Sequence, residues 1–487
     1  MALGRAHTIA LDGVVARLVT VEANIGPGLP GIHLVGLGDA AVSESKDRVR
    51  TAVANARLPW PKTKIIVSMS PASLRKSGSH FDLSTALAVL AAGLPAPRLR
   101  HAVIVGELGL DGSVRPVPGV LPALLTARQN GFTHALIPPG NAGEAALIDG
   151  LTILAAPTLA AAWAWATGDG ELPQARGGGG VDKREVPDFA DLNGQQEARF
   201  AAEVAAAGGH HMLLLGPPGS GKSMIAARLP GILPPLTPAQ SLEATAVHSV
   251  AGNGQVMRRA PYIDPHHSVT RAALLGGGSG QPRPGAVSLA HHGVLFIDEA
   301  SEVPAAILDG LRMPLEDGQV RLMRSQREVV FPARFQLVLA ANPCRCATED
   351  PARCRCNSRE RAGYLRNLSG PMRDRIDITA RTTTIGRLDG DEEPSAVIAE
   401  RVGEARMRAR ARFGCINAAM DPHRLRREHP ADEVGMSMLG NMLGAGEISQ
   451  RGVDRTLKMA WTLADLDGAT QPNIDHIARA AQLRGEE

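Results

Sequence analysis

Apolar and polar positions alternate with two different periods in the first third of the chain. Strand-like runs at residues 64–69 and 102–106 are interleaved with helical patterns at residues 83–92 and 121–130, an order that predicts an α/β domain. Residues 168–187 then show no apolar periodicity and include four consecutive glycines. That composition predicts a flexible linker.

Beyond the linker, short apolar runs at residues 212–215, 294–297 and 335–341 are separated by segments of helical length. Strands that are apolar on both faces are typical of a parallel sheet with helices on each side. Helical patterns, among them residues 396–413 and 451–466, then continue toward the C-terminus without further strand patterns. This last region is predicted to form a small α-helical lid.

These changes of pattern predict an α/β protein of three domains. An α/β domain is expected at residues 1–168, the linker at 169–187, a core with a parallel sheet at 188–392 and the helical lid at 393–487. A chain of 487 residues is long enough for about three domains, each with a core of its own.

The composition restricts how the protein could bind nucleic acid. Its 52 basic and 49 acidic residues leave a net charge of +3, so a nucleic-acid surface would have to be a local patch. Aromatic residues make up only 3% of the chain. This argues against a protein that grips single strands mainly by stacking bases on exposed rings.

No segment of the sequence is typical of export or of membrane insertion. The start of the chain lacks a basic stretch followed by an apolar core, and the longest mainly apolar run, residues 152–167, is short for a bilayer and contains Pro157. Four of the five cysteines lie between residues 344 and 356, unlike a disulfide framework. A cytoplasmic protein without a membrane partner is expected.

A glycine-rich loop joins the apolar run at residues 212–215 to a helical pattern at residues 224–229. Its spacing is that of a phosphate loop, in which backbone N–H groups and a helix N-terminus surround phosphates. Lys222 is expected to reach the β and γ phosphates of ATP, and Ser223 to bind Mg²⁺. The flanking strand and helix disfavour the alternative, an ordinary glycine-rich turn. The predicted loop residues are Gly216, Pro217, Pro218, Gly219, Ser220, Gly221, Lys222 and Ser223.

Two carboxylates end the apolar run at residues 294–297. Asp298 is expected to bind the nucleotide's Mg²⁺ through water, and Glu299 to polarise the attacking water. Asn342 follows the next long apolar run and would position that water between Glu299 and the γ phosphate. Its alternative role is to cap the turn before Pro343.

Two arginines are candidates for contacts with the γ phosphate. Arg375 follows the core strands and could reach the ATP of a neighbouring subunit, where its planar fork would stabilise the charge of the transition state. Arg451 begins a lid helix and could sense the same phosphate. The alternatives, which charge spacing alone favours, are solvation and surface ion pairs of Arg375 with Asp374 or Asp377.

The assembled motifs resemble the magnesium-chelatase-like AAA+ ATPases of the ComM/YifB type over nearly the whole chain. Residues 268–278, 284–299, 341–346 and 449–466 carry the resemblance. It implies an AAA+ phosphate-loop core with ATP and Mg²⁺ as cofactors. It also implies that Arg375 is the arginine finger, that Arg451 is the second sensor with Arg455 as the alternative, and that the subunits form a ring, a homo-hexamer.

The N-terminal domain is similar to the Lon-protease/S5-like domain shared with RadA-type recombination proteins, notably at residues 106–119. Lon-type proteases use a serine and a lysine, and Leu121 stands at the position of that lysine. Without a base, a serine around Ser77 or Ser79 is not expected to act as a nucleophile. The domain is therefore expected to be a non-proteolytic binding or assembly module.

The sequence gives less information about the substrate on which the predicted ATPase acts. A segment rich in Gly, His and Pro occupies residues 258–284, and Arg321, Arg324 and Arg327 lie on a predicted hairpin. In related ring helicases, insertions at comparable places line the pore and contact DNA, where arginines track phosphates without reading bases. The alternative is a solvated hairpin with local ion pairs.

Four cysteines form two Cys-x-Cys pairs. Thiolates this close in a reducing compartment could bind a structural Zn²⁺ in tetrahedral coordination. The alternative is an ordered loop with free thiols. The residues concerned are Cys344, Cys346, Cys354 and Cys356.

Together, these features predict a ring-forming ATPase that acts as a helicase or branch-migration motor on single-stranded or branched DNA, in recombination or natural transformation. Two alternatives belong to other classes: an ATP-driven subunit of a metal chelatase and a protein-remodelling factor.

Overall fold

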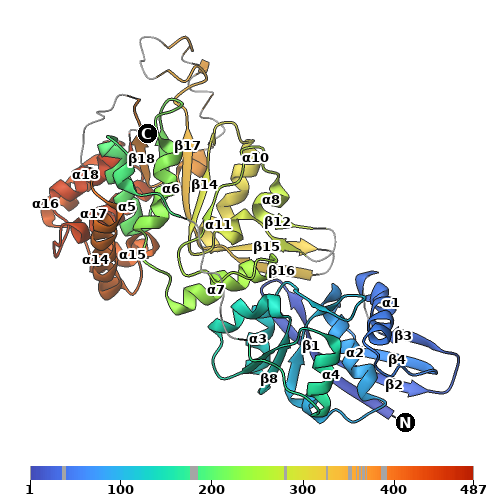
Figure 1. The fold of residues 1–487 in the computed structure, drawn as a ribbon. Coiled ribbons are helices and arrows are strands. Elements are labelled where there is room, and N and C mark those ends of the chain that lie inside the picture. Colours follow the sequence, from blue (N-terminus) through green and yellow to red (C-terminus); the bar gives the residue numbers. More distant parts are fainter. Residues whose placement is uncertain are drawn as a thin grey trace.

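The computed structural model places the N-terminal sheet at one end of the molecule, the helical C-terminal region at the other and a second sheet between them (Figure 1). Part of the predicted linker, residues 176–184, lies outside the described residues. No helix among those described is long and apolar enough to cross a membrane. The described residues are 2–35, 40–175, 185–278, 282–324, 327–348, 354–357, 359–360, 364, 368, 370–384 and 392–485.

The N-terminal domain is built on a seven-stranded sheet with the order β3-β4-β2-β1-β5-β8-β9. A long antiparallel hairpin forms its centre, and Gly13, at φ 66°, begins the two-residue turn between paired Asp12 and Val15. Helices α1, α2 and α4 cover one face, and α3 covers the other. The elements are β1 (Ala2–Asp12), β2 (Val15–Gly26), β3 (Gly31–Val35), α1 (Ala40–Asn55), β4 (Lys64–Ser70), α2 (Asp82–Ala91), β5 (Ala102–Ile104), β6 (Glu107–Leu108), β7 (Val114–Arg115), α3 (Val120–Gln129), β8 (His134–Ile137), β9 (Thr152–Ala155) and α4 (Leu159–Thr167).

The central domain contains a parallel five-stranded sheet with the order β11-β14-β17-β10-β18. Helices α5 and α6 pack on one face, and α8, α9 and α10 pack on the other. The elements are α5 (Gln196–Gly208), β10 (Met212–Leu215), α6 (Lys222–Ile232), α7 (Pro238–Val250), β11 (Tyr262–Ile263), α8 (Arg271–Leu275), β12 (Gly276–Gly277), β13 (Arg283–Pro284), α9 (Ala286–Leu289), β14 (Val294–Ile297), α10 (Ala305–Leu308), α11 (Arg312–Asp317), β15 (Gln319–Arg324), β16 (Arg327–Pro332), β17 (Gln336–Ala341), α13 (Gly370–Arg373) and β18 (Ile378–Arg381).

The C-terminal domain is helical, as predicted, and shares a hydrophobic core with the sheet face that α5 and α6 cover. The predicted helices at residues 396–413 and 451–466 coincide with α14 and α17. The elements are α14 (Ser395–Phe413), α15 (Pro422–Glu428), α16 (Glu433–Gly444), α17 (Gln450–Leu466) and α18 (Ile474–Arg484).

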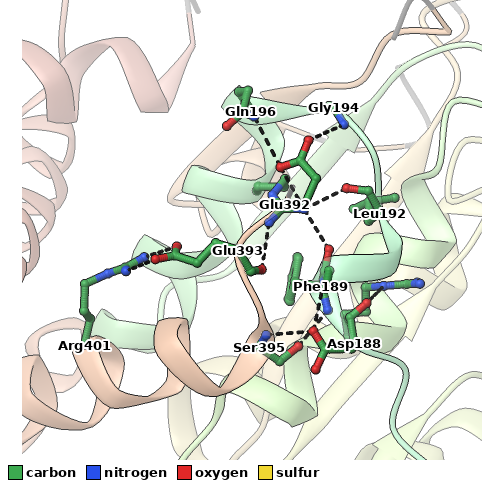
Figure 2. A network of polar contacts seen from close by, with 12 residues as sticks. Asp188, Phe189, Leu192, Gly194, Gln196, Glu392, Glu393, Ser395 and Arg401 are labelled. Atoms are coloured by element: carbon green, nitrogen blue, oxygen red, sulfur yellow. Dashed lines mark hydrogen bonds and ion pairs between the residues drawn. The ribbon is translucent and has the colours of Figure 1, made fainter. Parts of the chain in front are cut away.

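Polar contacts join the start of the C-terminal domain to the start of the central domain (Figure 2). Phe189 N donates to Ser395 Oγ at 2.7 Å, and Ser395 N donates to Asp188 Oδ1 at 2.8 Å. Arg401, on α14, bonds both Glu203 and Glu393 at 2.7 Å. Because these bonds satisfy the backbone where the two segments meet, the entry to α14 is fixed against the central domain.

The N-terminal and central domains meet where α3 contacts α7. Gly119 N donates to the Ser249 carbonyl at 2.9 Å, and the buried Glu144 accepts hydrogen bonds from Leu121 N at 2.8 Å and from Ser249 Oγ. Burial raises the pKa of Glu144, although its three hydrogen-bond donors, which include Asn141, act in the opposite direction. One buried carboxyl group therefore connects the two domains.

Candidate nucleotide site

The glycine-rich loop connects β10 to α6, as a phosphate loop requires. Gly219 and Gly221 adopt φ angles of 76° and 85°, in the left-handed region that favours glycine. A Cβ on Gly216 would lie 2.0 Å from Thr382 Oγ1, and the same hydroxyl bonds Ser220 Oγ at 2.6 Å. The loop is therefore held tightly against the end of β18.

Lys222 lies at the first position of α6 and is buried. Its Nζ donates to the carbonyl oxygens of Gly216 and Pro217 at 2.7 and 2.8 Å, and to Asn342 Oδ1 at 3.1 Å. Burial lowers the pKa of Lys222, while the two carboxylates after β14 raise it. The structure thus brings the predicted lysine and asparagine into direct contact, although they lie on different elements.

The end of β14 faces the same loop. Asp298 Oδ2 accepts a hydrogen bond from Ser223 Oγ at 2.7 Å, and its Oδ1 accepts from Glu299 N at 2.8 Å. A carboxylate and a hydroxyl oxygen side by side fit Mg²⁺, which prefers hard oxygen ligands. Asp264, which follows β11, is a second carboxylate near Asp298. Burial and the negative charge of Asp298 raise the pKa of Asp264.

Glu299 is exposed and has a strained backbone. Its φ angle is 48°, which is uncommon for a residue other than glycine and is often associated with active sites. His267 Nδ1 lies 3.0 Å from Glu299 Oε2. The sequence analysis did not predict a contact between His267 and Glu299. The only indication was that His267 belongs to the segment rich in Gly, His and Pro.

The candidate arginines line two cavities. Arg375 forms an ion pair with Glu316 and lines a cavity of about 210 Å³ with Arg451 and Arg455. A neighbouring cavity of about 730 Å³ is lined by Arg451, Arg455 and also Leu215, the residue directly before the loop. None of the loop residues 216–223, all of which the structure describes, lines either cavity.

The two lid arginines differ in their surroundings. Arg455 donates to the Ile376 carbonyl at 3.2 Å and lies 3.7 Å from Asp377. Burial would raise the pKa of Asp377, but the hydrogen bond and charge of His210, together with the charge of Arg455, outweigh it and lower that pKa. Among the described residues, no hydrogen bond or ion pair joins the Arg451 side chain to another residue, although its backbone is part of α17.

The four clustered cysteines are close enough to share one ion. The Sγ atoms of Cys344 and Cys346 are 3.2 Å apart, those of Cys346 and Cys354 are 3.5 Å apart, and all four lie within 4.8 Å of one another. Zinc with Zn–S bonds of about 2.3 Å needs sulfur atoms about 3.8 Å apart in a tetrahedron. The donor set and its spacing therefore fit Zn²⁺.

The structure describes part of the predicted arginine hairpin. Arg321 pairs with Glu328 at 3.3 Å across the β15–β16 hairpin, a local ion pair of the kind expected for a solvated hairpin. The side chains of Arg324 and Arg327 lie outside the described part of the chain.

In the N-terminal domain, the apolar side chain of Leu121 is buried, and Ser79 Oγ donates to Glu107. The absence of proteolytic activity stays a prediction.

Known families match all three parts of the chain. The matching descriptions are "Subunit ChlI of Mg-chelatase" over residues 21–141, "Magnesium chelatase, subunit ChlI" over residues 188–388 and "Magnesium chelatase, subunit ChlI C-terminal" over residues 392–484.

Similar proteins are found in several bacteria. An uncharacterized protein of Mycobacterium tuberculosis is 47% identical, with 99% of both chains covered. Competence protein ComM of Haemophilus influenzae is 38% identical over 99% of this chain and 98% of its own, and the uncharacterized YifB of Escherichia coli is 37% identical over 99% and 97%. DNA repair protein RadA of Mycolicibacterium smegmatis matches 33% of each chain at 30% identity.

Proposed function

Because the chain belongs to the ComM/YifB group of magnesium-chelatase-like AAA+ ATPases, we propose that it hydrolyses MgATP as a subunit of a ring that moves along DNA. The observation that carries the proposed hydrolysis of MgATP is the contact of Lys222 with Asn342, and of Ser223 with Asp298, at one edge of the sheet. We also propose that the domains divide as the patterns predict, with the linker ending at residue 187 and the lid beginning at 393.

The site residues have distinct roles in this proposal. Ser223, and Asp298 through water, would hold Mg²⁺, which would offset phosphate charge, and Lys222 binds the β and γ phosphates. Glu299 accepts a proton from water as the water oxygen bonds to the γ phosphorus and the bond from that phosphorus to the ADP oxygen breaks. Asn342, which contacts Lys222, orients the water.

A ring would bring the arginines of one subunit to the nucleotide of the next. Arg375 and Arg451 line one cavity that none of the loop residues 216–223 lines, and we propose that Arg375 reaches a neighbour's nucleotide. An arginine supplied by a second subunit makes each site incomplete without its partner. We propose a homo-hexamer, with Arg451 rather than Arg455 as the second sensor, because Arg455 is engaged with Asp377 and the Ile376 carbonyl.

DNA as the substrate is supported by the relatives named for competence and DNA repair. The decisive measurement is the ATPase rate with single-stranded, duplex and branched DNA, and without DNA, with Lys222→Ala as the inactive control. We expect stimulation that is strongest with single-stranded or branched DNA. If no form of DNA stimulates hydrolysis, the motor acts on something else, a porphyrin-like metal acceptor or a protein.

We also propose that the cysteine cluster holds one structural Zn²⁺. The supporting observation is four thiols within 4.8 Å, with all five cysteines free of disulfides. Free thiols fit a reducing compartment, and we propose the cytoplasm. Metal analysis of the purified protein should find about one zinc per chain, the complement of a single S₄ site.

A matched pair of variants tests the zinc site. Replacing Cys344, Cys346, Cys354 and Cys356 with serine should abolish zinc binding, whereas Cys415→Ser, which changes the cysteine outside the cluster, should retain it. Protein without zinc, purified in the absence of chelators, would refute the proposal.

A further inference from the structure

The turn that follows β11 runs beside the candidate catalytic carboxylate. Strand β11 pairs with β14 in parallel, with Tyr262 opposite Val294 and Ile263 opposite Leu295. Parallel neighbours end at the same edge of a sheet. The chain after Ile263 therefore emerges next to the residues that follow β14, and His267 comes from this turn.

The contact between the turn and the site is a specific one. His267 Nδ1 lies 3.0 Å from Glu299 Oε2, and the two side chains are 41% and 52% exposed. An ion pair this exposed contributes little to stability. The contact would instead fix the orientation of the Glu299 carboxylate, because one carboxylate oxygen lies against an anchored neighbour.

Several hydrogen bonds hold the turn that carries His267. Val269 N donates to the His266 carbonyl at 2.9 Å, and His266 Nδ1 bonds Ser268 Oγ at 2.8 Å. Thr270 Oγ1 then caps α8, and the following Leu274 is fully buried in the core. The imidazole of His267 is thus delivered from an anchored segment.

The backbone of Glu299 is also held, so its carboxylate direction depends on the side chain's partner. Glu302 N donates to the Glu299 carbonyl at 2.7 Å, and Ala300 N donates to the Ala340 carbonyl at 2.8 Å. With φ at 48°, the residue occupies a sparsely populated conformation that its surroundings must maintain. Among the described residues, His267 is the basic side chain within ion-pair distance of the Glu299 carboxylate.

We propose that His267 is a positioning residue for ATP hydrolysis, which holds Glu299 Oε2 so that Oε1 faces the attacking water. The inference rests on the proposed role of Glu299. It assigns the segment 258–284 a direct connection to the chemical step, because the turn that carries His267 belongs to that segment.

The geometry defines a set of variants. In His267, Nδ1 is bonded to Cγ, and the amide nitrogen of asparagine occupies the same position along the side chain, whereas that of glutamine lies one carbon further out. We expect His267→Ala to lower kcat by about tenfold to a hundredfold, since misplacing a reacting group by about 1 Å costs on that order. His267→Asn should restore most of this loss, and His267→Gln should restore little.

The readout separates positioning from general damage. ATP affinity and KM should stay close to the wild-type values in all His267 variants, because the phosphate loop is untouched. His33→Ala is the control, because His33 is an exposed histidine on β3 in the N-terminal domain. Equal losses in His33→Ala and His267→Ala would overturn the proposal, and so would a kcat that His267→Ala leaves unchanged or raises.

Failure of the inference and failure of the proposed function give different results. If the wild-type protein hydrolyses ATP and Glu299→Gln is slow, a normal His267→Ala rejects only the role of His267. If the wild-type protein does not hydrolyse ATP with or without DNA, both are rejected.

Discussion

Arg375 provides the sharpest test of a shared active site. It lines a cavity with Arg451 and Arg455, and none of the loop residues 216–223 of its own subunit lines that cavity. If it completes the neighbour's site, Arg375→Ala should lower kcat by about 10³- to 10⁵-fold, the range for an arginine finger. The bound nucleotide should be retained, because Lys222 and the loop are unchanged.

Rings that mix two inactive variants show whether Arg375 acts on a neighbour or within its own subunit, through the fraction of ATP sites that become active. An Arg375→Ala subunit keeps its own loop, and a Lys222→Ala subunit keeps its arginine. In equal, random mixtures, a site works when an Arg375→Ala subunit receives the arginine of a Lys222→Ala neighbour, so about a quarter of all sites should be active.

The assay is steady-state ATP hydrolysis after the two inactive variants have exchanged subunits. A double variant with both changes is the matched control, because it can supply neither a loop nor an arginine and should not rescue Arg375→Ala. Dilution of wild-type rings with the double variant reports whether exchange has occurred. If exchange is demonstrated and the mixture stays inactive, Arg375 does not act across a subunit boundary.

Three further predictions concern the loop and the domain contact. Lys222→Ala should lose ATP binding, whereas Glu299→Gln should bind ATP normally and hydrolyse it about 10²- to 10⁴-fold more slowly, as equilibrium binding and single-turnover assays will show. Gly216→Ala should destabilise the protein by about 1–3 kcal/mol, because its Cβ would overlap Thr382; unchanged denaturant unfolding would contradict this. The pKa of Glu144 is raised in the folded state, which favours its protonated form. The stability that Glu144 contributes is therefore present at low pH and is lost as the pH rises through its folded-state pKa. Thermal unfolding of Glu144→Gln, measured across this pH range, should lack this pH-dependent loss of stability.

Local patterns in the sequence were sufficient for the elements that carry the chemistry. The strands before Gly216 and Asp298 are continuous apolar runs, so their type and ends could be predicted, and parallel strands place their following residues at one edge. The contacts Ser223–Asp298 and Lys222–Asn342 then follow from motif spacing together with the sheet.

Other features depend on contacts that no local pattern contains. Strand β11 has only two residues, too few for a periodicity signal, yet its pairing with β14 is what brings His267 to Glu299. The Glu144–Ser249 contact joins residues on separate domains. Such contacts are set by strand order and domain docking, which follow from packing of the whole chain rather than from any short window.

The choice between the two lid arginines shows the same limit at a single site. Arg451 and Arg455 are one helical turn apart on α17, so spacing gives both access to the same side of the helix. The structure distinguishes them because Arg455 approaches the largely buried Asp377, whose side chain is 13% exposed. Removing Arg455 would leave that buried charge with less compensation and should destabilise the lid, whereas removing Arg451 should affect hydrolysis and leave folding intact. Thermal unfolding and kcat measured on Arg451→Ala and Arg455→Ala would therefore separate the sensor from the structural residue, and a stable, slow Arg455→Ala would reverse the assignment.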